Sequence, residues 1–539
     1  MTRRAGDSHS RRRHTSRPSR LVRASRGPFA FATTSRISFE RIAVAAALSL
    51  GLLASAIVSA QSQAQPRQSA SPEAMAGTWV IDGATLIDGS GAPPRAASRI
   101  VGRGDRIECV GSASECAMPD GASVLDAVGK WAIPGLIDTH VHLEWDASGE
   151  AQRAQTVRLA LGITTTRDAG TRGQLERTLA ARARSLAPET PEPRLVVSGL
   201  VADDGVAEGA DVAARVRQLA GLGVDAIKIK KRFSAAELQA IVRDAHAAGL
   251  PVWGHTWDEK GSFLAPSLDA GIDGVTHMFT FSEFAVRGDS SRPAAPEGLA
   301  FWVWLVEAWN HQDETRLREA LDRMVAQKVW LEPLLATERH FTLPYPVPAD
   351  VAYLDEVPSL QQLIRGWLPI GDSGWQRRRD RQARIDAVYA RMCQTVRTFH
   401  ARGGMVITGS DESPAGLALL DEVSLLAGCG FTPVEAIQAA TQHAATALRL
   451  RDVGTIAPGM RADIILLSAD PIADLANLRR TWRVVKAGHA YDPAALLEPF
   501  VSEHASALRT AWTLRAGGFV VLAGSVALLG RLWRRRRRA

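Results

Sequence analysis

Six residues that can bind a metal ion lie at or just after the ends of short apolar runs in this chain. In chain order they are His140, His142, Lys228, His255, His277 and Asp411. Such runs are typical of buried β-strands, and side chains two positions apart in a strand lie on the same face. His140 and His142 can therefore bind one ion together. Imidazole nitrogen and carboxylate oxygen are ligand types that suit zinc-like divalent ions.

These side chains can meet only if the runs that precede them converge at one edge of a sheet. Helix-like stretches such as 235–248 separate several of the runs, which indicates parallel βαβ units. We expect eight strands, near 132–138, 163–167, 194–199, 224–229, 251–255, 274–277, 328–332 and 405–410. In a (β/α)8 barrel, all eight strands end in one mouth. The sequence therefore predicts an α/β fold with a (β/α)8 TIM-type barrel.

The ordered motifs resemble those of the amidohydrolase superfamily. The matching segments are 132–142, 162–170, 225–228, 246–255, 271–277, 430–441 and 454–467. The nearest branch is that of the imidazolonepropionase-like and prolidase-like metal-dependent hydrolases. The resemblance extends over roughly 78–495 and is weakest over 282–400. One motif alone would be weak, whereas the ordered set is specific.

This resemblance implies a role for each candidate ligand. His140, His142 and Asp411 would hold one divalent ion, and His255 and His277 would hold a second. Zn²⁺ fits these ligand types best. Lys228, carboxylated by carbon dioxide, would bridge the two ions. Asp411 would act as general base and then general acid for a metal-activated hydroxide.

The expected activity is the hydrolysis of an amide C–N bond in a small molecule. The bond would be peptide-like, N-acyl or cyclic, and the substrate an amide or dipeptide-like compound. The sequence identifies neither the substrate nor the oligomeric state, so a homo-oligomer stays open.

Several alternatives stay open at this stage. Lys230 follows Lys228 where close relatives often have an aromatic residue or methionine, so Lys230 could itself be the bridge. Asp258 and Glu259 follow His255 closely, as acids do in mononuclear metal deaminases, which require no carboxylated lysine. A lactone or phosphotriester hydrolase could use the same ions. A non-catalytic barrel that acts as a binding protein is the alternative from another class, although no expected ligand is missing.

The segments that flank the barrel predict a second, smaller domain. Strand-like runs with turns occupy 78–130 and recur over 451–495, on either side of the barrel at 131–450. We expect the two flanks to form one composite β-sandwich. Linkers are expected at 61–77 and 496–510.

The basic composition comes from the two ends of the chain. Residues 1–41 carry a net charge of +9 and residues 531–539 carry +6, so the formal +7 leaves −8 for the rest. An acidic body does not indicate a nucleic-acid-binding surface, and no nucleic-acid partner is expected.

Apolar stretches near both ends predict a place at the cell envelope. Residues 42–60 follow the basic region and predict a signal peptide or anchor within 1–60. Residues 512–533 are mostly apolar, so we expect 511–539 to be a transmembrane or sorting segment with an arginine tail. The protein is therefore expected to be exported to the periplasm and membrane-anchored.

Two local features predict structure rather than chemistry. Cys109 and Cys116 are close enough in sequence to close a small disulfide loop in an oxidising compartment. The stretch Thr432-Pro433-Val434-Glu435 predicts a helix start, with a capping box and proline at the first helical position.

Overall fold

The computed structural model describes most of the chain from residue 73 onward. The described ranges are 73–74, 77–143, 149–170, 173–187, 189–202, 211–258, 261–281, 309, 313–340, 375–411 and 415–538. The chain divides into two units, Met1–Arg67 and Gln68–Ala539, and every described residue belongs to the second. The predicted signal peptide or anchor within 1–60 therefore lies outside the described residues.

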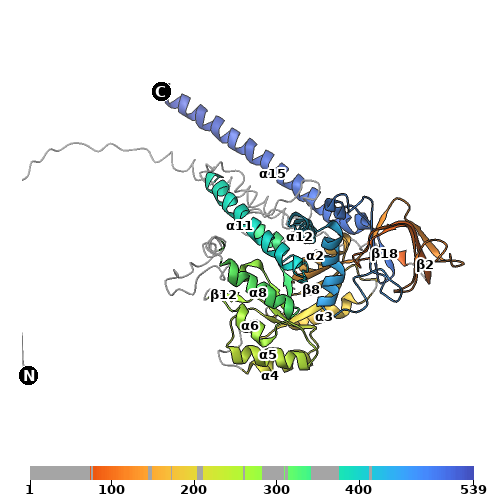
Figure 1. The fold of residues 1–539 in the computed structure, drawn as a ribbon. Helices are drawn as coiled ribbons and strands as arrows, with labels where there is room; N and C mark the ends of the chain where they lie inside the picture. The colour runs from red at the N-terminus through yellow and green to blue at the C-terminus, as the bar shows by residue number, and fades with distance from the viewer. Residues whose placement is uncertain are drawn as a thin grey trace, which may run out of the picture. The chain divides into compact units, whose positions relative to one another are not determined.

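A parallel sheet of seven strands forms the framework of the described chain. In order its strands are β7 (Leu136–Val141), β8 (Ile163–Asp168), β9 (Arg194–Leu200), β10 (Ala226–Ile229), β11 (Val252–Gly254), β14 (Gly274–Thr276) and β15 (Trp330–Glu332). Helices alternate with these strands, and α4 (Val212–Gly221), α5 (Ala235–Ala247) and α6 (Leu264–Ala270) pack side by side (Figure 1). The predicted alternation of strands and helices is confirmed.

The eighth expected strand, 405–410, is not a regular strand. It forms one isolated parallel bridge, between Val406 and Leu331. Ser410 N donates to the side chain of Asp138 at 2.9 Å and, at a longer 3.3 Å, to the strand carbonyl His140 O. A φ of 48° then turns the backbone at Asp411. These two features prevent a regular ladder, so the described part of the chain has seven parallel strands instead of eight.

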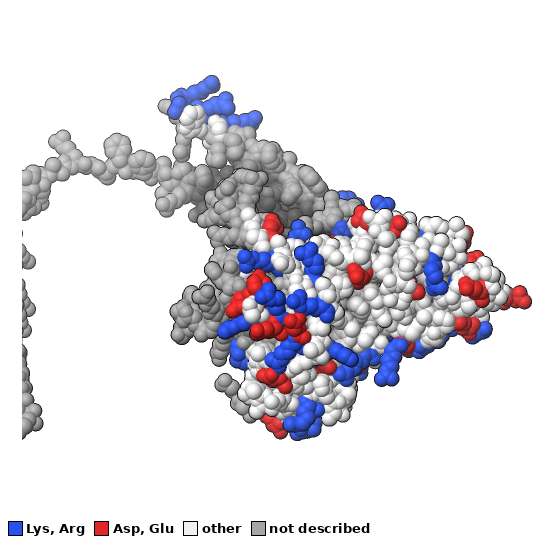
Figure 2. Space-filling model, viewed as in Figure 1, with Lys and Arg blue, Asp and Glu red and all other residues white. Residues whose placement is uncertain are grey.

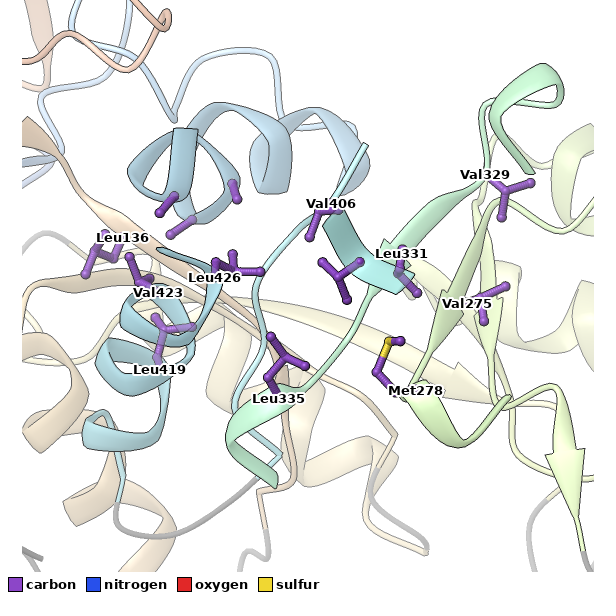
Figure 3. Packing of buried hydrophobic residues seen from close by; sticks show 14 of the residues in the cluster. Leu136, Val275, Met278, Val329, Leu331, Leu335, Val406, Leu419, Val423 and Leu426 are labelled. Atoms are coloured by element: carbon purple, nitrogen blue, oxygen red, sulfur yellow. The ribbon is translucent and has the colours of Figure 1, made fainter. Parts of the chain in front are cut away.

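Hydrogen bonds nevertheless attach this segment on both of its sides. Ile407 N donates to Leu331 O of β15, and Asp411 N donates to His140 O of β7 at 2.8 Å. Figure 3 shows Val406 beside Leu331, with Leu426 of α12 (Leu417–Gly428) close by. All three side chains are buried. Because burying such a side chain contributes about 1.5–3 kcal/mol, the core as well as the backbone holds the segment between the two edge strands.

A second sheet joins strands from both flanks of the parallel sheet. Its order is β1 (Glu73–Ala74), β18 (His489–Tyr491), β17 (Thr481–Lys486), β16 (Ile464–Leu467), β6 (Trp131–Pro134), β2 (Thr78–Leu86), β3 (Arg95–Arg103) and β4 (Arg106–Gly111), with β5 (Ser123–Asp126) paired to β2. Strands β6 and β16 run antiparallel and unite the two flanks. The flanks thus build one mixed sheet together, and the described residues do not show a separate second layer.

The expected first barrel strand, 132–138, is divided between the two sheets. Its first part belongs to β6 in the mixed sheet, and its second part belongs to β7 in the parallel sheet. Gly135 lies at the division, and a Cβ there would lie 2.1 Å from Thr164 Oγ1. Only glycine allows the chain to pass so close to β8 at this point.

The predicted transmembrane anchor is wrong. Residues 511–533 belong to α15 (Pro493–Arg536), and no helix among the described residues is both long and apolar enough for a membrane span. Arg515 and Arg531 leave fifteen uncharged residues between them. At about 1.5 Å each these reach roughly 22 Å, short of a bilayer core of about 30 Å. The predicted membrane partner and the membrane-anchored location at the cell envelope relied on this span and are corrected with it.

Charges of both signs are interspersed on the face of the molecule that Figure 2 shows. Many are paired across neighbouring elements, as are Arg217 with Asp244 at 2.6 Å and Arg402 with Asp322 at 2.7 Å. Exposed pairs of this kind contribute at most about 1 kcal/mol each, so the stability of the fold rests mainly on its core.

Both local predictions are confirmed. Cys109 and Cys116 form a disulfide with a Cα–Cα distance of 5.8 Å. Thr432 begins α13 (Pro433–Gln438) with a reciprocal capping box to Glu435. A second disulfide, which the sequence did not predict, joins Cys393 of α11 (Trp375–Ala401) to Cys429 at the end of α12.

The first prediction concerns the passage between the sheets. Gly135→Ala should lower the free energy of unfolding by about 1–3 kcal/mol, because the added methyl group overlaps Thr164. Gly221→Ala is the matched control, since nothing lies within 4 Å of its Cβ position and alanine favours the helix by up to about 1 kcal/mol. Urea unfolding measures both variants. A Gly135→Ala variant as stable as the wild type would contradict the close approach.

Candidate metal centre

Strand β7 presents the first two candidate ligands. His140 lies within the strand and is fully buried, whereas His142 follows the strand and its side chain is 29% exposed. Their ring centroids are 5.3 Å apart. The alternation of strand side chains places both rings on one face, as the His-x-His spacing predicted.

Asp411 lies between the histidines from both halves of the sheet. Its Oδ1 is 3.2 Å from His142 Nε2 and 3.6 Å from His140 Nε2, and its Oδ2 is 3.4 Å from His277 Nε2. Burial alone would raise the pKa of Asp411, but the neighbouring histidines outweigh it and hold the pKa below its ordinary value. The carboxylate is therefore ionised and surrounded by ring nitrogens.

His255 and His277 follow the strands β11 and β14 and complete the cluster. Their ring centroids are 4.7 Å apart, and the His277 ring is 5.7 Å from that of His140. His140, His255 and His277 form one possible ligand set, and His140, His142 and Asp411 form another. Within each set the ligand atoms lie within 4.8 Å of one another. The two sets share His140.

Two of these residues have an unusual backbone conformation. His277 has a φ of 69° and Asp411 a φ of 48°, both in the left-handed region. Such a conformation costs of order 1–3 kcal/mol in a residue other than glycine, although Asp and His tolerate it better than most. Strain of this kind clusters at functional sites, and here it turns both side chains into the cluster.

Lys228 lies at the same end of β10 and is fully buried. Its Nζ has no hydrogen-bond partner among the described residues. Burial, assisted by the charge on Arg167, lowers the pKa of Lys228 to about 7. Lys230 is only half-buried, although its charge also reaches Lys228 and His255. Of the two lysines considered from the sequence, Lys228 is therefore the one enclosed beside the cluster.

The imidazole groups suit a metal ion in their protonation state. Burial holds the pKa values of His140 and His255 well below their ordinary value and lowers that of His277 to about 4. The rings are therefore neutral near pH 7, as metal binding requires. His140 Nε2 has no hydrogen-bond partner among the described residues. The nitrogen and oxygen donors present thus fit a divalent ion of the zinc type.

Glu332, at the end of β15, orients His140. Its Oε2 lies 2.7 Å from His140 Nδ1, which leaves Nε2 directed at the cluster. Its Oε1 accepts hydrogen bonds from Thr139 Oγ1 and from Arg167 Nη2, the latter at 3.2 Å. Arg167 also lies 4.0 Å from the centre of the Trp253 ring. A carboxylate on the outer nitrogen of a ligand histidine fixes its tautomer and orientation.

The segment 405–411 approaches this network closely because it contains a glycine. A Cβ on Gly409 would lie 2.6 Å from the Cβ of His140 and 3.1 Å from Glu332 Oε1. Asp138 connects the same segment to β7, since its carboxylate accepts hydrogen bonds from His140 N and from Ser410 N and Oγ. The backbone directly before Asp411 is thereby attached to β7.

The comparisons with known proteins agree with this arrangement. A model of the family described as "Amidohydrolase family" matches residues 131–490, which include all six candidate ligands. The chain belongs to the amidohydrolase family. Members of this family depend on metal ions, in keeping with the His and Asp groups of the structure.

Individual relatives of this amidohydrolase support its placement in the predicted branch. An imidazolonepropionase from Streptomyces griseus is 28% identical over 389 residues, 69% of this chain and 86% of the relative. An imidazolonepropionase from Cereibacter sphaeroides is 25% identical over 420 residues, which are 74% of this chain and 94% of the relative. A solved Xaa-Pro dipeptidase covers 77% of this chain and 100% of its own, with 20% identity and a TM-score of 0.56. The predicted class, an enzyme that hydrolyses C–N bonds, is confirmed.

The sequence did not identify two acidic residues that contact the candidate ligands. Glu332 ends the expected strand 328–332, and this position was the available signal, because most of the other predicted strand ends, such as Asp138, His255 and His277, carry a polar side chain. Glu338 lies in α9 (Leu335–His340), where its Oε1 is 3.4 Å from His277 Nδ1. No sequence pattern marks Glu338. Asp258 and Glu259, on which the deaminase alternative rests, have no described side chains.

A prediction follows for the Glu332 network. Glu332→Ala should lower the free energy of unfolding by about 3–5 kcal/mol, because it leaves the buried Arg167 without its carboxylate. The control is Asp322→Ala, which removes an exposed partner of Arg402 and should cost less than about 1 kcal/mol. Chemical denaturation of both variants checks the difference. If both variants lost the same free energy of unfolding, the burial of Glu332 would not explain its contribution to stability.

Proposed function

We propose that this amidohydrolase holds two divalent metal ions and hydrolyses an amide bond in a small molecule. The observation that carries the proposal is the pair of ligand sets that share His140. In this proposal His140, His142 and Asp411 hold one ion, and His255 and His277 hold the other. The buried Lys228, carboxylated, joins the two.

The metal ions would supply Lewis acidity, which polarises the carbonyl group and lowers the pKa of water from 15.7 towards about 7. The carboxylation of Lys228 is supported by its burial, because a lysine with a pKa of about 7 is partly neutral and able to react with carbon dioxide. An ammonium group cannot bind a metal cation, whereas the carbamate formed from it supplies an anionic oxygen ligand.

Asp411 is the residue proposed to move the proton. Its side chain is only 16% exposed, and one of its carboxylate oxygens would accept a proton from the attacking water. The same oxygen would then deliver the proton to the leaving nitrogen. The low pKa of Asp411 favours the ionised form that this first step requires.

The proposed fold is a closed (β/α)8 barrel with the site at its mouth. The hydrogen bonds of 405–411 to both β15 and β7 support closure, since they connect the two edges of the seven-stranded sheet. The predicted domain limits, with the barrel at 131–450 between flanks at 78–130 and 451–495, remain part of the proposal.

The names of the relatives define the substrates to screen. They include imidazolonepropionases, a Xaa-Pro dipeptidase and an N-acyl-D-aspartate deacylase from Alcaligenes xylosoxydans, the last 45% identical over only 64 residues. Cyclic amides, dipeptides and N-acyl amino acids are therefore the proposed classes. Lactones and phosphotriesters belong in the same screen as competing substrates.

Metal content is the first test of the proposed function. Elemental analysis of the purified protein should find two zinc-like ions per chain, and mass spectrometry of gently handled protein should find carboxylated Lys228. Lys228→Ala should lose the second ion, and Lys230→Ala should retain both. One ion per chain, with Lys228 unmodified, would instead indicate a mononuclear deaminase.

Asp411→Asn tests the proton transfer. On a substrate from the screen, kcat should fall at least about a hundredfold, because an amide cannot accept the proton. Asp126→Asn makes the same chemical change at an exposed position of β5 and should leave kcat unchanged. Near-normal turnover by Asp411→Asn, with its metal retained, would contradict the assigned mechanism.

A further inference from the structure

One short segment, 332–338, contacts three of the candidate ligands or their immediate neighbours. Glu332 begins the segment and hydrogen-bonds His140 through its side chain, and its backbone O accepts from His277 N at 3.0 Å. The segment then turns at Leu334, which has a φ of 54°. The rest of it, from residue 335 onward, belongs to α9.

The α9 part of the segment contacts the same cluster through two side chains. Thr337 Oγ1 donates to Ser410 O at 2.7 Å, directly before Asp411. Glu338 Oε1 lies 3.4 Å from His277 Nδ1 and accepts from Met278 N at 3.1 Å. Thr337 and Glu338 are both buried. The position of α9 therefore affects His277 and the loop with Asp411 together.

Helix α9 has six residues, so its own hydrogen bonds do little to hold it in place. The backbone N–H groups of its first turn have no partner within the helix. Glu422 of α12 supplies the acceptor, since its Oε2 lies 2.7 Å from Ala336 N and its carboxyl also bonds Leu335 N. Glu422 is fully buried, 86 residues further along the chain.

We infer that Glu422 is a positioning residue of the metal centre, which acts through α9 on His277 and on the loop that carries Asp411. Among the described residues, Glu422 hydrogen-bonds Ala336 N and Leu335 N and forms no hydrogen bond or ion pair with a candidate ligand. Its hydrogen bonds to α9 connect it to the ligands through Thr337 and Glu338. The inference rests on the proposed metal site.

A structural role alone would give a different result from a positioning role. If Glu422 only stabilised the fold, its loss would lower the melting temperature and leave the metal affinity of the folded protein unchanged. If Glu422 positions the ligands, the affinity itself must fall. Groups that orient metal ligands typically change affinity by about 10–100-fold when they are removed.

The experiment measures zinc affinity by competition with a chromophoric chelator, on metal-free full-length protein. Glu422→Leu should weaken zinc binding at least about tenfold. Glu422→Gln keeps a carbonyl acceptor for Ala336 N, and should bind zinc within about threefold of the wild type. Thr337→Val removes only the hydrogen bond to Ser410 O, and should weaken zinc binding even where Glu422→Leu does not fold.

Glu192→Leu is the matched control. Glu192 is also a buried glutamate, but it pairs with Arg184 at 3.1 Å, just before β9 and away from the ligands. This variant should lower the melting temperature and leave zinc affinity unchanged. Wild-type affinity in both Thr337→Val and a folded Glu422→Leu would overturn the inference, as would equal losses in Glu422→Gln and Glu422→Leu.

Hydrogen exchange separates failure of the inference from failure of the proposed function. In metal-free protein, the amides of Leu335 and Ala336 should exchange faster in Glu422→Leu than in Glu192→Leu. A wild type that binds no zinc would refute the proposed function, and the exchange rates would then decide whether Glu422 holds α9. Equal exchange in both variants would overturn the role of Glu422.

Discussion

The Glu332 carboxylate is fully buried, and a buried carboxylate is stable only where donors surround it. Its donors come from two other strands, Thr139 and His140 from β7 and Arg167 from β8. The need to satisfy this one charge therefore fixes the ends of β7, β8 and β15 relative to one another. The cluster of histidines lies at the edge of the sheet where these strands end. Arg167 in turn donates to Thr139 O and lies against the face of Trp253.

Strain and polarity at this edge oppose the ordinary preferences of a protein core. Left-handed backbone at His277 and Asp411, together with several buried charges, costs stability that an apolar interior would not lose. The closely packed cluster around Val406, Leu331 and Leu426 offsets this cost on the adjacent side. The candidate metal ligands and the apolar core thus lie next to each other at the same sheet.

Local patterns made much of the site predictable. His140, His277 and Asp411 each end an apolar run, and strand side chains that end at one edge meet there whatever the intervening chain contains. The capping box at Thr432 is likewise decided by four consecutive residues. Such features depend on short-range geometry, which a single sequence carries in full.

The features that the sequence did not predict depend on distant partners. The division at Gly135 follows from the pairing of β6 with β16, more than 300 residues later. Glu338 gains its role only because α9 folds against the cluster. The apolar segment 512–533 predicted a membrane span from composition, whereas the charges at Arg515 and Arg531 limit its uncharged length.

The pairing of β6 with β16 also sets an order in time. β6 ends at Pro134 and its partner begins at Ile464, so 330 residues must be synthesised before the two strands can meet. At about 5–20 residues per second this takes roughly 15–65 s. During that interval one edge of β6 lacks its partner, and an exposed strand edge can pair with other chains. Nascent protein that stalls within this interval should therefore be the form most in need of a chaperone.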